Sequence, residues 1–353
     1  MKIMFFTGGF EYGGAQRVIC NLANAFSDTD DTVVVMASYA PPTYQLNDKV
    51  KLINGLKWEN YLDGIIKLRK CILSEKTDVL IAFGVQYNIA ACIAALGTKT
   101  KVIVSERNDP KRMPKQKSLK MLRFITYRFA DGFVFQTEDA QRYFDSSIIK
   151  RSTIIANPLY LKDSIPEVKG RKKRIITASR YVPQKNLGLL IKSFSRVSAK
   201  FPDWSIDMYG DGDEIDNLRN LAQKCGIIDK VKFNPATKQI HEVMRENSVF
   251  VLTSEFEGMP NSLMEAMGEG MTCISTDCSC GGPRFLIEND VNGCLFPVGD
   301  EKKLSILLDE ILENETKRLM MAERAISIRE KLSPESIMIE WKQYIRNIVN
   351  GKS

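Results

Sequence analysis

Short apolar runs alternate with longer amphipathic stretches along the first half of the chain. The runs have the length and β-branched content of buried strands, and they fall at Lys2–Thr7, Thr32–Ala37, Asp78–Gly84, Lys101–Ser105, Gly132–Gln136 and Thr153–Ala156. Helix-length stretches separate them at Ala15–Phe26, Leu62–Ser74, Tyr87–Leu96 and Lys117–Phe129. This order of strands and helices predicts a parallel sheet with covering helices.

The second half of the chain repeats this alternation. Strand patterns fall at Ile175–Ala178, Ser205–Tyr209, Val231–Phe233, Val249–Thr253 and Cys273–Ser275, and helical stretches follow at Glu301–Glu313, Glu315–Lys331 and Pro334–Asn350. Between the halves, residues 160–174 are polar and contain Pro166 and Gly170, as a linker does. We therefore expect an α/β protein with two Rossmann-like domains, residues 1–165 and 172–332. Ligands bind outside the carboxyl ends of parallel strands, so the turns there are expected to line a central cleft that both domains face.

Length and composition agree with two globular domains. At 353 residues the chain exceeds what one hydrophobic core usually organises. Its 44% hydrophobic and 26% charged residues are ordinary for a soluble protein. No apolar run approaches the roughly 20 residues of a membrane helix, and the first run is too short for a signal peptide. We therefore expect a cytoplasmic location.

Cysteine and histidine usage argues against a metal site. The eight cysteines show no Cys-x-x-Cys spacing, and His241 is the only histidine. The cysteines are interpreted as reduced core thiols.

Positive charge is concentrated between Lys111 and Arg128. This segment holds seven basic residues and no acid, in a chain whose net charge is +7. Apolar residues alternate with the cations, so a helix here would suit an anionic membrane surface, on whose inner face the protein would then be peripheral, or a lipid-diphosphate acceptor. A charged helix that packs its apolar side on the sheet has the same pattern. Nucleic acid is not expected, because no recognised binding module accompanies the basic segment.

The sharpest motif is Thr253–Met267, which passes from a strand end through a turn into a helix. Pro260 suits the first helical turn, and the next three amides are then free to bind an anion at the positive end of the helix dipole. Glu257 and Glu265 flank that position, and carboxylates accept hydrogen bonds from the vicinal hydroxyls of sugars and riboses. The motif favours a sugar nucleotide, although a capped helix with two surface glutamates has the same spacing.

A second motif follows the strand Ile175–Ala178. Arg180 and Lys185 lie five residues apart in this turn, where a guanidinium fork and an ammonium could reach one diphosphate. A solvated charged turn is the alternative. A third turn, Gly8–Arg17, is rich in glycine and opens a helix, but it lacks the Gly-x-Gly-x-x-Gly spacing of a dinucleotide site.

Together these turns resemble glycosyltransferase family four, the retaining enzymes of GT-B fold, over nearly the whole chain. The resemblance rests on Gly13-Gly14-Ala15-Gln16-Arg17, Ser105-Glu106-Arg107-Asn108-Asp109-Pro110, Ala156-Asn157-Pro158, Arg180 with Lys185-Asn186, Gly210-Asp211-Gly212, the Glu257 to Glu265 motif, and Gly282-Pro283-Arg284. It implies that residues 333–353 form a helix that crosses back to the N-terminal domain.

The resemblance also implies roles for single residues. Arg180 and Lys185 would hold the donor diphosphate, Glu257 the hydroxyls of the transferred sugar, and Glu265 the ribose. Further donor contacts would come from Gly14 in the other domain, from Gly210, from the base-contacting turn Asn234-Pro235, and from Gly258, Met259, Pro260, Asn261, Ser262 and Leu263. Glu257, Arg180 and Lys185 are the predicted catalytic residues, and the C-terminal domain is the predicted donor domain.

The acceptor side departs from the family. Many members carry a histidine at the turn that here reads Ser105-Glu106-Arg107-Asn108-Asp109. This sequence resembles the turn of a subgroup that builds bacterial surface or lipid-linked saccharides, and Glu106, Arg107 and Asp109 are the candidate acceptor residues. Asp211-Gly212-Asp213 matches the metal-binding Asp-x-Asp of another glycosyltransferase fold, but here it begins a helix, where acids complement the dipole, so no metal is expected.

These expectations combine into one reaction and its rivals. The chain is predicted to move a hexose or N-acetylhexosamine from a nucleotide diphosphate sugar, with UDP preferred, to a hydroxyl of a saccharide acceptor, without a further cofactor. An inactive GT-B subunit that binds a partner enzyme or a glycan is the first alternative. A sugar-nucleotide epimerase of the same fold is the second, although it usually needs more acid-base groups.

Overall fold

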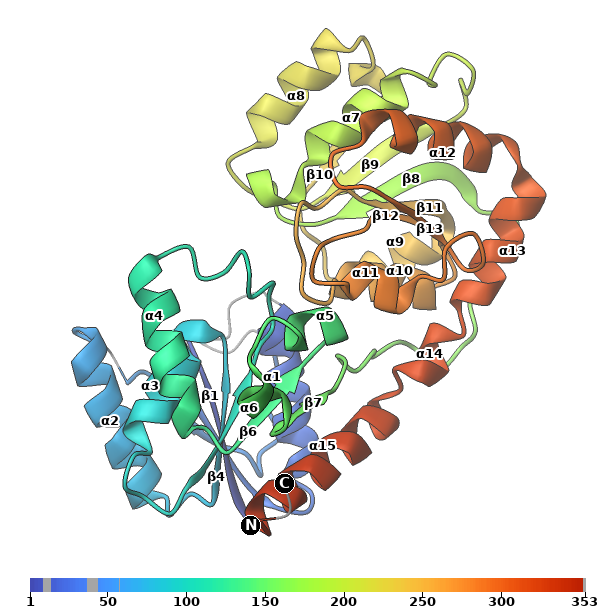
Figure 1. The fold of residues 1–353 in the computed structure, drawn as a ribbon. Helices are drawn as coiled ribbons and strands as arrows, with labels where there is room; N and C mark the ends of the chain where they lie inside the picture. Colours follow the sequence, from blue (N-terminus) through green and yellow to red (C-terminus); the bar gives the residue numbers. More distant parts are fainter. Residues whose placement is uncertain (9–13, 37–43, 57, 352–353) are drawn as a thin grey trace. The chain divides into compact units, whose positions relative to one another are not determined.

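The computed structural model describes residues 1–8, 14–36, 44–56 and 58–351. The chain forms two compact units, residues 1–158 with 334–353 and residues 159–333 (Figure 1). The segment 160–174, which the sequence pattern identified as linker, belongs to the second unit. Among the described residues, no helix combines the length and apolar character needed to cross a bilayer.

The first unit is built on a parallel sheet. Its described strands lie in the order β3 (Lys51–Ile53), β2 (Asp31–Met36), β1 (Lys2–Thr7), β4 (Val79–Phe83), β5 (Lys101–Ser105), β6 (Gly132–Phe135) and β7 (Ser152–Ile154). The strand order reverses direction between β1 and β4, which makes their carboxyl ends the topological switch point of a doubly wound sheet.

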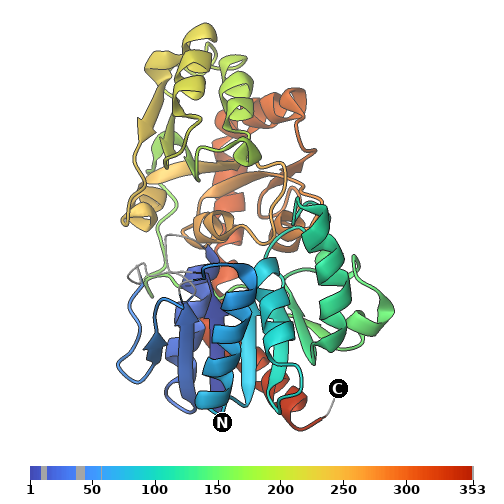
Figure 2. The ribbon, with the colours of Figure 1, turned by 90° about the vertical axis from the view of Figure 1, so that its left-hand side faces the viewer.

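Helices cover both faces of this sheet. Those of the first unit are α1 (Gly14–Phe26), α2 (Tyr61–Ser74), α3 (Val85–Ala94), α4 (Lys117–Thr126), η1 (Tyr127–Phe129), α5 (Glu138–Gln141), α6 (Ser146–Ile149) and α15 (Pro334–Val349). Helices α2, α3 and α4 lie side by side on one face (Figure 2). The C-terminal helix α15 is part of this unit, because Trp341 is fully buried against Phe83 and the Tyr344 hydroxyl accepts a 2.7 Å hydrogen bond from the Phe133 amide.

The second unit repeats the plan. Its described strands, all parallel, lie in the order β10 (Val231–Asn234), β9 (Ser205–Tyr209), β8 (Lys172–Ala178), β11 (Asn247–Leu252), β12 (Thr272–Thr276) and β13 (Cys294–Phe296). Its helices are η2 (Pro183–Lys185), α7 (Leu187–Ser195), α8 (Ile215–Lys224), η3 (Ile228–Lys230), α9 (Ile240–Glu246), α10 (Asn261–Gly268), α11 (Gly282–Leu286), α12 (Glu301–Glu313), α13 (Glu315–Ala325) and α14 (Ile328–Lys331). The switch point lies between β8 and β11.

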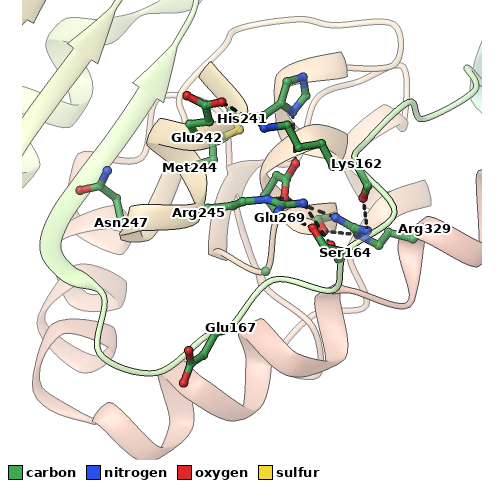
Figure 3. A network of polar contacts seen from close by, with 12 residues as sticks. Lys162, Ser164, Glu167, His241, Glu242, Met244, Arg245, Asn247, Glu269 and Arg329 are labelled. Carbon is green, nitrogen blue, oxygen red and sulfur yellow. Dashed lines mark hydrogen bonds and ion pairs between the residues drawn. The ribbon is translucent and has the colours of Figure 1, made fainter. Parts of the chain in front are cut away.

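A buried carboxylate fixes the segments by which the chain enters and leaves the second unit. The Glu269 side chain is fully buried, and its carboxylate forms ion pairs with Arg245 Nε at 2.6 Å and with Arg329 Nη2 at 3.3 Å (Figure 3). Arg245 also donates to Ser164 Oγ at 2.8 Å, and Arg329 donates to the Lys162 carbonyl at 2.9 Å. Burial would raise the pKa of Glu269, but the contacts from His241 and Arg245 and the neighbouring positive charges hold that pKa below its ordinary value. The polar segment that was expected to be a linker is therefore held to the second unit by hydrogen bonds at Lys162 and Ser164.

Candidate functional site

Two loops meet at the switch point of the second sheet, one after β8 and one after β11. Lys185 ends the short helix η2 that follows β8, and Glu257 lies in the loop that follows β11. Lys185 Nζ contacts Glu257 Oε1 at 2.5 Å, and the two side chains are 16% and 11% exposed. The structure thus brings together two residues that lie 72 positions apart and belong to separate sequence motifs.

Hydrogen bonds between the two loops fix this pair. Thr253 Oγ1 donates to the Lys185 carbonyl at 2.8 Å, and Gln184 Nε2 donates to the Phe256 carbonyl at 2.8 Å. Asn186 then takes a left-handed conformation with φ of 44°, which turns the chain from η2 into α7. Neither loop is a solvated turn: each one holds the backbone of the other.

Ser254 orients the Glu257 carboxylate. Its hydroxyl donates to Glu257 Oε1 at 2.6 Å, and the serine is fully buried. The Ser254 carbonyl in turn accepts from Thr276 Oγ1 at 2.7 Å, which ties the loop to the end of β12. One carboxylate oxygen therefore receives both an ammonium and a hydroxyl donor. Ser254 was not among the residues predicted from the sequence, although its position directly after the expected strand was a usable signal.

Arg180 lies on the exposed side of the β8 loop. Its side chain is exposed and forms no ion pair with any residue that the structure describes. The next residue, Tyr181, is buried, and its hydroxyl donates to the carbonyls of Met208 and Asn234 at 3.0 and 3.2 Å. Arg180 is therefore a solvent-facing cation on an anchored backbone, available for an anionic ligand.

Gly210 and Gly212 let two loops pack backbone to backbone. A Cβ atom on Gly210 would lie 1.9 Å from the Ser179 carbonyl oxygen, and one on Gly212 would lie 2.4 Å from that of Tyr181. Both glycines also have positive φ angles, 156° and 137°. In this structure the missing side chains make room for the loop that carries Arg180. That role differs from the predicted direct contact of Gly210 with a ligand, which stays a prediction.

The first turn of α10 differs in detail from its prediction. Pro260 is the N-cap residue and the helix begins at Asn261. The Leu263 amide donates to the Pro260 carbonyl at 3.1 Å, so the expectation that this amide is free for an anion is corrected. A tight turn at the helix start often closes such a hydrogen bond. Glu265 is half-buried in α10. Gly258 packs closely on Gly282, since a Cβ atom on Gly282 would lie 1.8 Å from the Gly258 carbonyl oxygen.

Two buried polar atoms next to these loops have no hydrogen-bond partner among the described residues. They are Ser179 Oγ, at the end of β8, and Asn234 Nδ2, at the end of β10. Pro235 follows Asn234 and is exposed. Because buried polar groups in proteins are normally paired, a hydroxyl and an amide donor left over at the carboxyl ends of two strands on either side of β9 fit a polar ligand there.

The predicted acceptor residues of the first unit are less exposed than expected. Glu106 is 4% exposed and its carboxylate accepts a hydrogen bond from the Tyr127 hydroxyl. Burial raises the pKa of Glu106, which the positive charge of Arg123 and this hydrogen bond only partly oppose. Asp109 is 1% exposed. Both carboxylates are buried in this structure, and their role toward an acceptor stays a prediction.

Arg107 also points into the protein. Its guanidinium lies 4.6 Å from the ring centre of Phe83 and 5.6 Å from that of Trp341, and it donates to Asn157 Oδ1 at 2.8 Å and to Ser105 Oγ at 2.7 Å. Burial lowers the pKa of Arg107 to about 9. The Arg107 contacts join β5, the segment after β7 and the C-terminal helix α15, which is a structural role that the sequence did not reveal.

The predicted glycine turn, Gly8–Arg17, lies in a region that the structure describes only in part. Residues 9–13 of the glycine turn lie outside the described residues, and Gly14 is the first residue of α1. At Gly8, a Cβ atom would lie 1.9 Å from the Tyr87 hydroxyl.

Within the described ranges, no group of three His, Cys, Asp or Glu side chains is placed to hold a metal ion.

Two parallel Rossmann-like sheets, each with a switch point, are the architecture of a GT-B fold, and the charged loops of the second sheet are the candidate site for an anionic ligand. Residues 12–162 match the profile of Glycosyltransferase Family 4, and residues 162–327 match that of Glycosyl transferases group 1. The chain belongs to glycosyltransferase family four and is a glycosyltransferase.

Known proteins align with the chain over nearly its full length. An uncharacterized glycosyltransferase of Haemophilus influenzae is 26% identical, over 94% of this chain and 95% of that protein. An alpha-1,4-N-acetyl-D-galactosaminyltransferase of Campylobacter jejuni, whose name includes a PP-undecaprenol-linked saccharide, is 25% identical over 99% of this chain and 100% of that protein. The crystal structure of Anabaena HepE with UDP has a TM-score of 0.83 at 18% identity, covering 98% of this chain and 100% of that one. The GT-B fold predicted from the sequence is thereby confirmed.

Proposed function

We propose that this glycosyltransferase moves a hexosyl or N-acetylhexosaminyl unit from a UDP-sugar to a hydroxyl of a saccharide acceptor, with retention of the anomeric configuration. The observation that carries the proposal is the Lys185–Glu257 pair, which joins the two loops at the switch point of the second sheet. A diphosphate requires cations and a sugar requires a hydrogen-bond acceptor. This pair supplies one of each, side by side.

Each charged residue has a distinct task in the proposed reaction. Arg180 and Lys185 bind the diphosphate and stabilise the negative charge that grows on it as the glycosidic bond breaks. Glu257 accepts hydrogen bonds from hydroxyls of the transferred sugar, and Glu265 accepts them from the ribose. The amides at the start of α10 and those of Gly258 and Met259 add neutral donors.

Retention follows from a reaction on one face of the sugar. The bond between the anomeric carbon and the phosphate oxygen breaks, the acceptor oxygen bonds to the same face, and the departing phosphate oxygen takes the acceptor proton. No protein nucleophile is needed, and closure of the site around the substrates would exclude water.

UDP is the preferred nucleotide and a surface glycan is the preferred product. HepE has been crystallised with UDP-glucose, and the Campylobacter relative acts on a PP-undecaprenol-linked saccharide. By analogy, the acceptor proposed for this chain is a saccharide on a lipid carrier, built at the inner face of a bacterial membrane. The first unit would bind this acceptor and the second unit the donor.

A donor panel tests the proposal. Thermal unfolding is followed with UDP, GDP and ADP and with their sugars, because a ligand at a hundredfold excess over its Kd stabilises the folded state by about 2.7 kcal/mol. We expect stabilisation by UDP and UDP-sugars, and its loss in the Lys185→Met variant. An unchanged melting temperature across the panel would rule out the donor assignment, and a response to GDP or ADP alone would rule out UDP.

A further inference from the structure

Large apolar side chains are exposed along the outer side of α4 and η1. Met121 is 62% exposed, Phe124 60%, Ile125 47% and Phe129 52%. These four residues, here called the α4 patch, lie within nine positions of one another. Single exposed apolar residues are ordinary on protein surfaces, but a contiguous group marks a site of contact with a partner or a membrane.

Three of the four patch residues lie on one face of α4, and Phe129 follows in η1. The helix α4 is held to the unit by its other face. Met121, Phe124 and Ile125 have the i, i+3, i+4 spacing of neighbours on a helix surface. Arg123 is 3% exposed, and it donates to the Pro110 carbonyl and the Tyr143 hydroxyl, each at 3.0 Å. The helix therefore buries a cation and half-buries Leu119 and Leu122, while Met121, Phe124 and Ile125 stay exposed. These three apolar residues do not pack on the sheet.

Cations accompany the α4 patch along the chain. Lys117 lies one turn before Met121 and Lys120 lies directly before it. The Arg128 guanidinium, directly before Phe129, lies 4.8 Å from the ring centre of Phe124. The sequence contains no acid from Lys111 to Ala130, and Asp131, the first acid after it, pairs with Lys101 at 2.9 Å. The net charge of this segment is positive and is not balanced within its own helix. Asp145, the N-cap residue of α6, is an acid of another element that interacts electrostatically with Arg128.

We propose that the α4 patch docks the protein on an anionic lipid bilayer. The four apolar side chains enter the boundary between headgroups and acyl chains, and Lys117, Lys120 and Arg128 bind headgroup phosphates. A bilayer is favoured over a protein partner because three cations accompany the apolar residues and the segment carries no acid, which suits a continuous anionic surface. The inference deepens the proposed function and rests on its lipid-linked acceptor.

Cosedimentation with vesicles tests the proposal. The full chain is mixed with vesicles of phosphatidylcholine alone or of phosphatidylcholine with phosphatidylglycerol. We expect binding to the anionic vesicles that weakens with salt. The double variant Phe124→Ser/Ile125→Ser should bind roughly tenfold or more weakly, and each of Lys117→Gln, Lys120→Gln and Arg128→Gln should cost a factor of about five.

A matched variant and two further readouts make each outcome decisive. Ile306→Ser/Met320→Ser removes two exposed apolar side chains of the second unit, at 50% and 46% exposure, and should bind vesicles like the wild type. UDP binding is measured in the α4 variant, because retained UDP binding with lost vesicle binding separates this inference from the donor assignment. Equal vesicle binding by the wild type and the α4 variant would overturn the inference. So would a dimer in light scattering that the α4 variant dissociates, since the face would then be an interface between copies.

Discussion

Replacing Glu257 by glutamine should strengthen UDP binding while it lowers the stability of the free enzyme. In the free protein, Lys185 is neutralised by Glu257 at 2.5 Å. A diphosphate that takes Lys185 as its own counter-ion must compete with that carboxylate. Glu257→Gln removes the competitor and keeps a similar shape, so the lysine is free for the nucleotide.

The burial of the pair sets the magnitude. An exposed ion pair contributes roughly 0–1 kcal/mol, and removing one partner of a fully buried pair costs about 3–5 kcal/mol. Lys185 and Glu257 are 16% and 11% exposed, so an intermediate cost of about 2 kcal/mol is expected for the free enzyme. For a unit of this size the melting temperature should fall by roughly 4–8 °C. The same 2 kcal/mol is the upper limit of the gain in UDP affinity, about thirtyfold in Kd.

Calorimetric titration of UDP and thermal unfolding measure the two effects. Glu257→Gln should lower the Kd for UDP, and Lys185→Met should raise it. Transfer should fall in both variants, because the first loses the sugar contact and the second the phosphate contact. Glu255→Gln is the matched control, since Glu255 carries the same charge two residues earlier and is exposed. If Glu257→Gln weakened UDP binding as Lys185→Met does, the two residues would not exchange partners and the reasoning would be wrong.

Three other predictions concern positions outside the ion pair. Folding lowers the pKa of Glu269 below its ordinary value of 4.5. The ionised carboxylate therefore stabilises the fold above pH 4.5, and this stabilisation is lost as the pH falls through the pKa of the folded state. Glu269→Gln should flatten the acid limb of a plot of unfolding free energy against pH. Folding raises the pKa of Glu106, so the contribution of its protonated carboxyl to stability is full below pH 4.5 and is lost as the pH rises. In urea unfolding, Glu106→Gln should therefore become more stable relative to the wild type between about pH 4.5 and neutrality. A loss of stability that grows with pH would contradict the assignment. Gly210→Ala forces a Cβ to within 1.9 Å of the Ser179 carbonyl oxygen, so it should destabilise the second unit by several kcal/mol and weaken UDP binding, as read by unfolding and titration; wild-type behaviour would mean that the loop can shift.

The fold could be predicted from the sequence because its strands are buried on both faces. Parallel strands of this kind are continuous apolar runs, and nearly all of them were placed within two or three residues. The exceptions have a physical reason. The edge strands β3 and β13 were not predicted, because each is three residues long and carries little pattern. Strand β8 begins at Lys172, before its expected start at Ile175, because its first residues are charged and continue the polar pattern of the linker.

The donor loops could be predicted in part. A charged turn directly after a buried strand has to lie at the carboxyl edge of the sheet, which placed Arg180, Lys185 and Glu257 at one edge before any contact was known. The contact between Lys185 and Glu257 could not be predicted, because it depends on β8 and β11 being neighbours. The packing role of Gly210 was hidden for the same reason, since a glycine that faces a backbone and one that faces a ligand have the same sequence.

The burial of the acceptor-side residues could not be predicted, because sequence does not show which way a charged side chain points. Glu106 and Asp109 turn inward, and Arg107 lies between two aromatic rings with neutral hydrogen-bond partners. Substituting these residues would disturb the packing of the first unit, and a loss of transfer would then say little about the acceptor. The search for acceptor determinants should therefore begin with what the first unit presents outward. Its exposed aromatic and basic α4 surface can be changed without removing a buried contact, so a defect there reports on recognition.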